Sequence, residues 1–166
     1  MYKKILTQTS LSTVLTLTEV KRQCRVFTDF EDDYLTSLIP VYADLAQSYT
    51  NRMLTEGTAV VVVEEYASVI LLPYGEVTEV TKVELDGVES TAFTFDDVTQ
   101  KVKISEPYSE CKIYFSCGYV DIPDVVKAAI CMMISTAYNN RDDVVVGQTI
   151  AEMPRRSLDL LDRVRL

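Results

Sequence analysis

The chain of 166 residues contains no histidine. Histidine is the commonest general base near neutral pH and the commonest metal ligand, so most familiar hydrolase constellations are excluded. The sequence also lacks a glycine-rich phosphate loop, a Gly-x-Ser-x-Gly nucleophile turn and a His-Glu-x-x-His zinc motif. We therefore expect a protein that is not an enzyme and that binds no cofactor.

The sequence also has no clear metal-binding motif. The cysteines Cys24, Cys111, Cys117 and Cys131 include no Cys-x-x-Cys pair, so a zinc site is poorly supported and buried free thiols in a reduced cytoplasm are expected. Adjacent carboxylates occur at Asp32/Asp33, Asp96/Asp97 and Asp142/Asp143. Each pair falls at an expected turn or helix end, where exposed aspartate is common, and none has the spacing of an EF-hand. We predict no metal site, although a metal-dependent nuclease built on Asp32 or Asp142 is a distant alternative.

Long apolar runs and excess positive charge are absent as well. No run approaches the roughly 20 apolar residues of a membrane span, and the first residues do not resemble a secretion signal. The formal net charge is −9, which disfavours nonspecific attraction to nucleic acid or to an anionic membrane. We expect a soluble intracellular protein without membrane contact.

The most informative stretch that is present runs from Pro123 to Arg141. Apolar pairs recur every four positions and predict one broad stripe on a helix, at Val125/Val126, Ala129/Ile130, Met133/Ile134 and Ala137/Tyr138. The other side carries the small or apolar residues Ala128, Cys131, Met132 and Ser135. A helix with so little polar surface must be covered on most sides, either by the rest of this chain or by a neighbouring subunit. Composition alone leaves both possibilities open.

Two helices are predicted before this one. Thr16-Leu17-Thr18-Glu19 fits a capping box that begins a short helix ending near Arg25. An acid-rich turn then leads into a helix from about Glu31 to Met53, whose expected core stripe is Leu35, Leu38, Tyr42, Leu45, Tyr49 and Met53. Pro40 lies inside this helix and predicts a kink or break between Thr36 and Pro40.

The middle of the chain has a different pattern. Short runs rich in Val, Ile, Thr, Tyr and Phe predict strands at 58–64, 68–72, 77–85, 92–95, 101–104 and 112–116. Asp86-Gly87 between apolar neighbours is the strongest hairpin signal. We therefore predict an α+β fold: a small helical bundle from residues 16–56 and 119–166, a β-rich antiparallel insertion at 57–118, and an extended N-terminal arm at 1–15.

Charge is concentrated in the predicted insertion. Residues 57–118 carry four basic and eleven acidic side chains, a net charge of −7, while 1–56 and 119–166 each carry a net charge of −1. The excess acid is explained either by a solvated surface or by a surface that repels a polyanion.

A short basic helix is expected at the C-terminus. Leu158, Leu161 and either Val164 or Leu160 are predicted to face inward. Arg155, Arg156, Arg163 and Arg165 form either a solvated face or a surface for an acidic partner, because arginine suits bidentate contacts with carboxylates.

The order of these elements resembles the head–tail connector, or head-completion adaptor, family of long-tailed bacteriophages. The residues that carry the resemblance are Leu17-Thr18-Glu19-Val20-Lys21, Glu31-Asp32-Asp33, Gly118-Tyr119, Ile122-Pro123, Val126-Lys127-Ala128-Ala129-Ile130, Tyr138-Asn139-Asn140-Arg141, Met153-Pro154, Leu158, Leu160-Leu161 and Arg165. Two departures are Pro40, in a helix that the family keeps rich in alanine, and Glu106-Pro107, where the family usually has Trp-Pro.

The resemblance implies a structural virion protein at the head–tail interface, assembled in the host cytoplasm. Such proteins form a ring, commonly of twelve subunits, below the portal protein. The ring extends the channel through which double-stranded DNA passes without sequence-specific binding, and it offers a platform for the next stopper or tail component. A small non-catalytic β-domain adaptor, acting as a monomer or dimer in another complex, is the alternative.

A ring favours a neighbouring subunit as the cover for the second face of the helix. On this basis the expected ring interface comprises Ala128, Cys131, Met132, Ser135, Tyr138 and Arg141, together with the helix from Glu31 to Met53. The expected portal-docking residues are Arg155, Arg156, Arg163 and Arg165.

Overall fold

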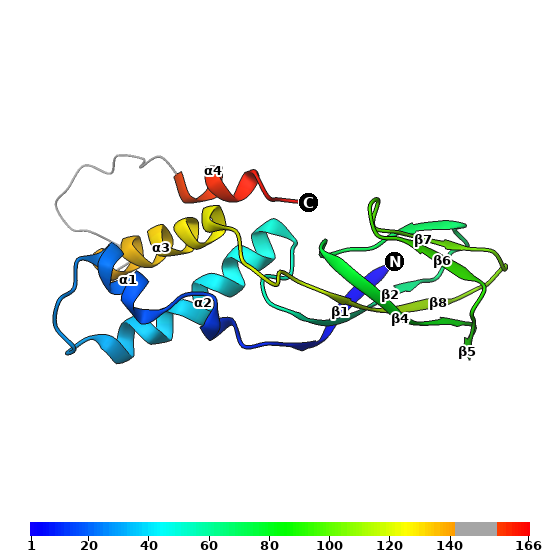
Figure 1. Cartoon of the computed structure of the whole chain (residues 1–166), viewed down its shortest axis with the longest axis horizontal. Helices are drawn as coiled ribbons and strands as arrows, with labels where there is room; N and C mark the ends of the chain where they lie inside the picture. The colour runs from blue at the N-terminus through cyan, green and yellow to red at the C-terminus, as the bar shows by residue number, and fades with distance from the viewer. Residues whose placement is uncertain (142–155) are drawn as a thin grey trace. The chain divides into compact units, whose positions relative to one another are not determined.

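The computed structural model describes residues 1–141 and 156–166. These residues form four α-helices and two antiparallel sheets, so the predicted α+β class is confirmed (Figure 1). The chain divides into two compact units, which are described separately. The β unit comprises residues 1–9, 51–121 and Leu166, and the helical unit comprises residues 10–50 and 122–165.

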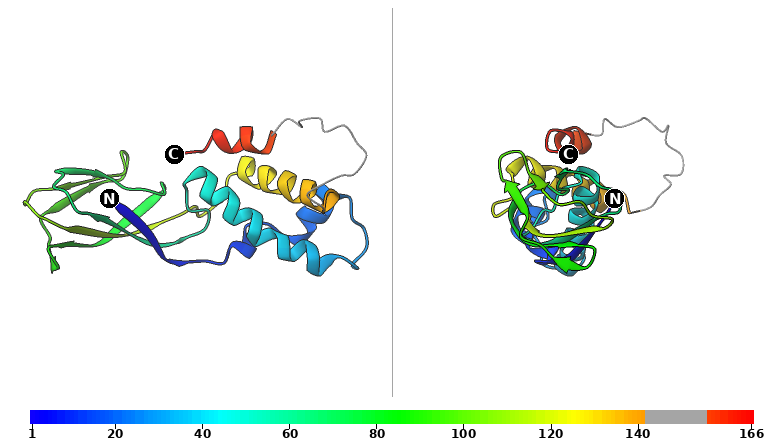
Figure 2. Two further views of the ribbon diagram at one scale, coloured as in Figure 1. Left: turned by 180° about the vertical axis from the view of Figure 1, so that it is seen from behind. Right: turned by 90° about the vertical axis from the view of Figure 1, so that its right-hand side faces the viewer.

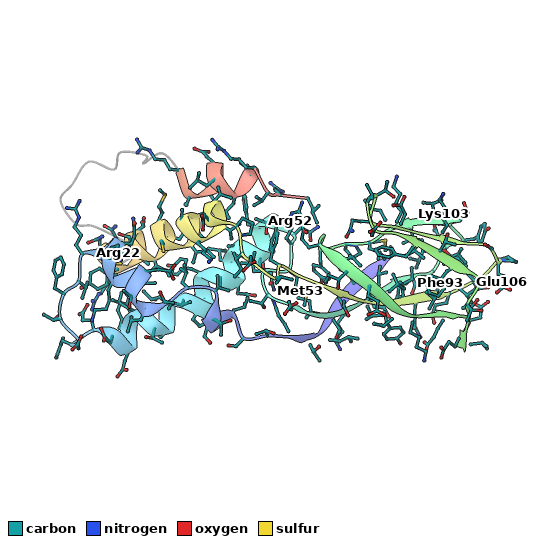
Figure 3. All side chains as sticks on the ribbon, viewed as in Figure 1. Arg22, Arg52, Met53, Phe93, Lys103 and Glu106 are labelled. Carbon is teal, nitrogen blue, oxygen red and sulfur yellow. The ribbon has the colours of Figure 1, made fainter. Side chains whose placement is uncertain are left out.

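The β unit contains a five-stranded and a three-stranded sheet. The larger sheet has the order β1 (Tyr2–Gln8), β2 (Gly57–Val63), β8 (Cys111–Cys117), β4 (Val77–Leu85) and β5 (Val88–Glu89). The smaller sheet has the order β3 (Val69–Leu71), β7 (Lys101–Ile104) and β6 (Phe93–Asp96). Phe93 and Lys103, labelled in Figure 3, mark β6 and β7. All six predicted strands are therefore present, each in an antiparallel pairing.

The first strand was not predicted. Residues 1–15 were expected to form an extended arm, and Tyr2–Gln8 of that segment pairs antiparallel with β2, from Tyr2 opposite Val62 to Gln8 opposite Gly57. Five of its seven side chains are exposed, so the strand carries no regular alternation of apolar residues. The pairing with β2 through backbone hydrogen bonds is what orders this segment.

The Asp86-Gly87 hairpin is confirmed. Leu85 pairs with Val88, and both turn residues have positive φ angles, 50° at Asp86 and 82° at Gly87, as a tight hairpin turn requires. The Asp86 carboxylate also accepts hydrogen bonds from the backbone N–H groups of Ser109 at 3.0 Å and Glu110 at 2.8 Å. The turn is therefore tied to the start of β8.

One apolar core lies within the β unit. Side chains from both sheets contribute to it, among them Val61 of β2, Val102 of β7, Val83 of β4 and Phe115 of β8. Alternate residues of β8 are buried, as expected for a central strand with one face on a core. Met53, labelled in Figure 3, is fully buried in the same cluster, and its sulfur lies 3.4 Å from the Cys117 Sγ.

The helical unit contains a short 3-10 turn at Leu11–Thr13 and the four helices α1 (Leu17–Cys24), α2 (Asp32–Thr50), α3 (Asp124–Asn139) and α4 (Arg156–Asp162). The predicted capping box is confirmed. The Thr16 N–H donates to Glu19 Oε2 at 2.7 Å, and the Glu19 N–H donates to Thr16 Oγ1 at 3.3 Å. Two amides that would otherwise lack a partner are thereby satisfied at the first turn of α1.

Of the predicted kink or break in α2, the break does not occur. The helix continues through Pro40 from Asp32 to Thr50. Proline leaves the carbonyl of the residue four positions earlier without its donor. That residue, Thr36, lies on the exposed side of α2, where water can replace the donor.

The predicted core stripe of α2 was also partly wrong. The buried helix residues are Leu35, Ile39, Ala43, Ala46, Gln47 and Thr50. Of the predicted stripe, Leu35 is buried, Leu38, Tyr42 and Tyr49 are half-buried, and Leu45 is 50% exposed. Met53 lies beyond the end of α2 at Thr50 and is buried in the core of the β unit. Two of the buried positions are alanines, which allow close approach of a neighbouring helix, so the core face of α2 includes small residues and leaves Leu45 outside it.

The predicted stripe of α3 is confirmed in its central part. Val126, Ala129, Ile130, Met133 and Ile134 are buried, and α3 packs against α1, α2 and α4. Figures 1 and 2 both show α4 running alongside α3. Leu161 is the fully buried residue of α4, and Leu158, Leu160 and Val164 are half-buried. No helix within residues 1–141 and 156–166 is both long enough and apolar enough to cross a membrane.

Candidate interaction surfaces

The second face of α3 is partly covered within the chain. Ala128 is exposed, whereas Cys131, Met132 and Ser135 are half-buried. Ser135 forms a hydrogen bond with Cys24 of α1, and burial raises the pKa of the Cys131 thiol to about 11. α1 therefore covers one side of this face, and the surface around Ala128 remains exposed.

An aromatic and ionic cluster lies where α3 ends and α2 begins. Arg141 Nη2 donates to Glu31 Oε2 at 2.6 Å, and the guanidinium lies 4.5 Å from the ring centre of Tyr34 and 5.2 Å from that of Tyr138. Hydrogen bonds from Arg141 and Tyr138 lower the pKa of Glu31. The cluster therefore joins two elements that are 110 positions apart in the sequence.

The connection between α1 and α2 exposes two aromatic side chains. Phe27 is 93% exposed and Phe30 is 92% exposed, and we call this pair the aromatic knob. Lys21 Nζ lies 2.8 Å from Asp29 Oδ1 and 2.7 Å from Asp32 Oδ1, so one lysine of α1 holds the connection and the first turn of α2. Sequence reasoning recognised the acidic residues here and missed the two phenylalanines.

A groove runs between α2, α3 and α4. Its volume is about 410 Å³, and we call it the helical groove. It is lined by Tyr42, Leu45, Met133, Thr136, Ala137, Asn140, Ser157 and Leu158. The lining combines apolar and polar side chains from three helices. The exposed Arg156 precedes Ser157 on α4.

The predicted arginine surface is only partly described. Arg155 lies outside the described residues, while Arg156, Arg163 and Arg165 are exposed. The Arg165 guanidinium lies 5.0 Å from the ring centre of Tyr49 and 3.9 Å from Asp162 Oδ1. The Tyr49 hydroxyl in turn donates to Asp162 at 2.8 Å. Arg165 therefore has a structural role in the helical unit, whereas Arg156 and Arg163 extend from α4 and the turn that follows it.

A larger cleft lies within the β unit. Its volume is about 660 Å³, and Tyr2, Leu71, Leu72, Pro73 and Gln100 are among its lining residues. Lys3 also lines it and lies 4.7 Å from the ring centre of Tyr74, and Arg52 Nη1 lies 3.3 Å from Glu76 Oε1 (Arg52 is labelled in Figure 3). The apolar lining and the paired charges suit contact with a polypeptide more than a chemical reaction.

The candidate metal-binding residues are not clustered. Within the described residues no group of three or more Cys, Asp or Glu side chains is arranged to hold a metal ion. Asp32 pairs with Lys21, and Asp96 accepts hydrogen bonds from the N–H groups of Val98 and Thr99. The pair Asp142/Asp143 lies outside the described residues.

The cysteines are free. Cys111 and Cys117 are buried, as predicted, and Cys24 and Cys131 are half-buried. Burial raises the pKa of Cys111 to about 11 and that of Cys117 to about 12.

The fold is shared with chains of three solved particle structures. A chain from the neck of an empty gene transfer agent (GTA) particle, computed with C6 symmetry, matches with a TM-score of 0.75, 20% identity, and coverage of 99% of this chain and 95% of that one. A chain from the virion of the native particle matches with a TM-score of 0.75 and 19% identity, with the same coverage. A chain from the native neck, computed with C12 symmetry, matches with a TM-score of 0.73 and 18% identity over the same shares. No curated protein matches the chain.

The sequence assigns the family directly. The family model described as phage gp6-like head–tail connector protein matches residues 14–165. The chain therefore belongs to the phage gp6-like head–tail connector family, and the resemblance stated from its motifs is confirmed. It is a structural, non-catalytic protein.

Proposed function

We propose that this protein is a head–tail connector subunit that forms a homo-oligomeric ring of twelve copies in the virion neck, below the portal protein. The observation that carries the proposal is the family match, which extends over both compact units, from residue 14 to residue 165. The similarity to neck chains of a particle computed with C12 and C6 symmetry supports the ring. The subunits assemble in the host cytoplasm.

The second face of α3 contributes to the contact between neighbouring subunits in this proposal. Ala128 is exposed and small, so a neighbouring helix can approach its backbone closely. Cys131, Met132 and Ser135 are half-buried and retain surface that a neighbour can cover. The Glu31 side chain contacts both Tyr138 and Arg141, which complete the proposed contact with the same neighbour.

The basic residues at the end of the chain dock on the portal protein. Arg156 and Arg163 are exposed, and arginine forms strong bidentate contacts with carboxylates at interfaces. The proposed docking residues also include Arg165 of the same C-terminal segment and Arg155, which lies outside the described residues. An acidic surface on the portal protein is the matching partner.

The β unit faces either the DNA channel or the stopper or tail-completion protein that binds next. Residues 57–118 carry a net charge of −7, so a channel wall formed from them repels the DNA backbone. Double-stranded DNA then passes without the counterion-release binding that rows of Lys and Arg create, and without sequence-specific contacts. The same acidity makes a membrane partner unfavourable.

The test is co-assembly with the cognate portal protein, followed by mass measurement and imaging of the complex. We expect a ring of twelve copies on the portal. Arg163→Glu should weaken this binding, while Arg22→Glu, an exposed arginine on α1 (Figure 3), is the matched control and should bind normally. Failure of the wild-type protein to co-assemble with the portal would refute the proposal.

A further inference from the structure

The aromatic knob is the most exposed apolar feature of the helical unit. Phe27 and Phe30 are 93% and 92% exposed, more than any other large apolar residue that the structure describes. A phenylalanine buries on the order of 150–250 Å² when it is covered, so leaving two of them in water is unfavourable. Exposed apolar residues gathered in this way mark an interaction site.

The knob is also held in place. The Val26 N–H donates to the Lys21 carbonyl at 3.0 Å, and the Lys21 ammonium contacts Asp29, between the two phenylalanines, and Asp32, which follows them. Asp29 and Asp33 are exposed beside the knob. A partner surface should therefore offer an apolar recess with positive charge at its edge.

The helical groove of the same chain has these properties. Its volume of about 410 Å³ is lined by Leu45, Met133, Ala137 and Leu158, and the exposed Arg156 stands next to the lining residue Ser157. The knob extends from the α1–α2 connection, whereas the groove lies where α4 runs beside α2 and α3 (Figure 1). The chain therefore carries two different and complementary surfaces on one compact unit.

We propose that the aromatic knob of one copy inserts into the helical groove of the next copy. This inference rests on the proposed ring and names its contact. Contacts between two different surfaces of identical chains repeat head to tail, and they close into a ring when the rotation between neighbours allows it.

The areas are compatible with a stable contact. Two buried phenylalanines supply roughly 300–500 Å² on the knob side, about half of the roughly 800 Å² per partner in a standard interface. The exposed surface around Ala128 on α3 is available to supply more. Buried aromatic anchors of this kind dominate binding energy, so loss of both should weaken the contact by about 30-fold or more.

The test uses two variants that each disable one surface. Phe27→Ser with Phe30→Ser removes the knob, and Leu45→Glu places a charge in the groove at a residue that is 50% exposed. Val98→Ser, at an 86% exposed residue of the β unit, is the matched control. Because all these side chains are exposed, circular dichroism and thermal unfolding should show that each variant still folds.

We expect rings on the portal from the wild type and from Val98→Ser, and none from either disabled variant. Mixing the two disabled variants should give heterodimers and no rings, because each retains the surface that the other lacks. Rings from either disabled variant, or no heterodimers on mixing, would overturn the proposed contact while leaving the ring itself intact. If the wild type forms no ring on the portal, the proposed function fails and this contact fails with it.

A second measurement identifies the partner of the knob directly. Phe27→p-benzoylphenylalanine places a photoreactive group at the knob, and an isotope-labelled second copy separates contacts between chains from contacts within one. We expect a cross-link to Met133 or a neighbouring groove residue of the labelled copy. A cross-link to the portal protein would assign the knob to a different partner and refute the inference.

Discussion

The attachment of α4 to the helical unit is predicted to depend on Leu161. The helix has seven residues, Arg156–Asp162, and a helix this short is unstable alone in water. Leu161 is fully buried, and replacing a buried leucine by alanine costs about 2–5 kcal/mol. The other apolar residues of α4, Leu158 and Leu160, are only half-buried, and its end is held by the contacts of Asp162 and Arg165 with the half-buried Tyr49. We expect Leu161→Ala to release α4 locally while α1, α2 and α3 stay folded.

Hydrogen exchange measured by mass spectrometry on peptides from α4 and α3 tests this expectation. A loss of about 2 kcal/mol or more should speed exchange in α4 by roughly 30-fold or more and leave α3 unchanged. Leu160→Ala, at a half-buried position of the same helix, should have a clearly smaller effect and serves as the control. Unchanged exchange in α4, or equal acceleration in α3, would contradict local anchoring by Leu161.

Three further predictions follow from the described contacts. Glu19→Gln should lower the free energy of unfolding by about 0.5–1 kcal/mol at pH 7, since it weakens the capping box. The Thr16 hydrogen bonds lower the pKa of Glu19, so in the wild type this stabilisation is present above the ordinary pKa of 4.5 and is lost at lower pH. Acid titration of both proteins, followed by circular dichroism, checks this difference. Gly118→Ala should lower the free energy of unfolding by about 2 kcal/mol or more, because φ is +112° and the new Cβ would lie 2.2 Å from the Thr55 carbonyl oxygen. The control is Gly87→Ala, whose new Cβ meets no atom within 4 Å and which should lower it less. Denaturant titrations measure both changes. The free energy of unfolding should fall as pH rises above about 9, because thiols in the unfolded chain ionise there, while burial in the folded protein raises the pKa of Cys117 to about 12. Cys117→Ala should make this fall with pH less steep.

The parts of the fold that sequence reasoning predicted are those fixed by local chemistry. The capping box at Thr16 and the hairpin at Asp86-Gly87 each depend on a few neighbouring residues, and both are present. The strand β1 was missed because its order comes from pairing with β2, 49 to 60 positions away in the sequence, and not from its own pattern. The core face of α2 was misplaced because large residues such as Leu45 dominated the apolar pattern, while the structure buries Ala43 and Ala46.

The candidate surfaces were harder to predict from the sequence than the fold was. The family motif Tyr138-Asn139-Asn140-Arg141 was recognised, yet its contact with Glu31 depends on how α2 and α3 pack. The exposure of Phe27 and Phe30 could not be inferred either, since two phenylalanines near a helix start are ordinarily assigned to a core. The only available signal was the acidic turn around them, which favours an exposed connection.

The distribution of charge limits where neighbouring subunits can touch in a ring. Residues 57–118 of the β unit carry a net charge of −7, so close contact between β units of adjacent copies would bring like charges together. The segments 1–56 and 119–166, which supply the helices, each carry a net charge of only −1. The knob, the groove and the exposed face of α3 all belong to the helical unit, where repulsion is weak and apolar burial can dominate. In the proposed ring, assembly through the helical unit therefore leaves the acidic surface of the β unit free to repel DNA or to bind the next protein.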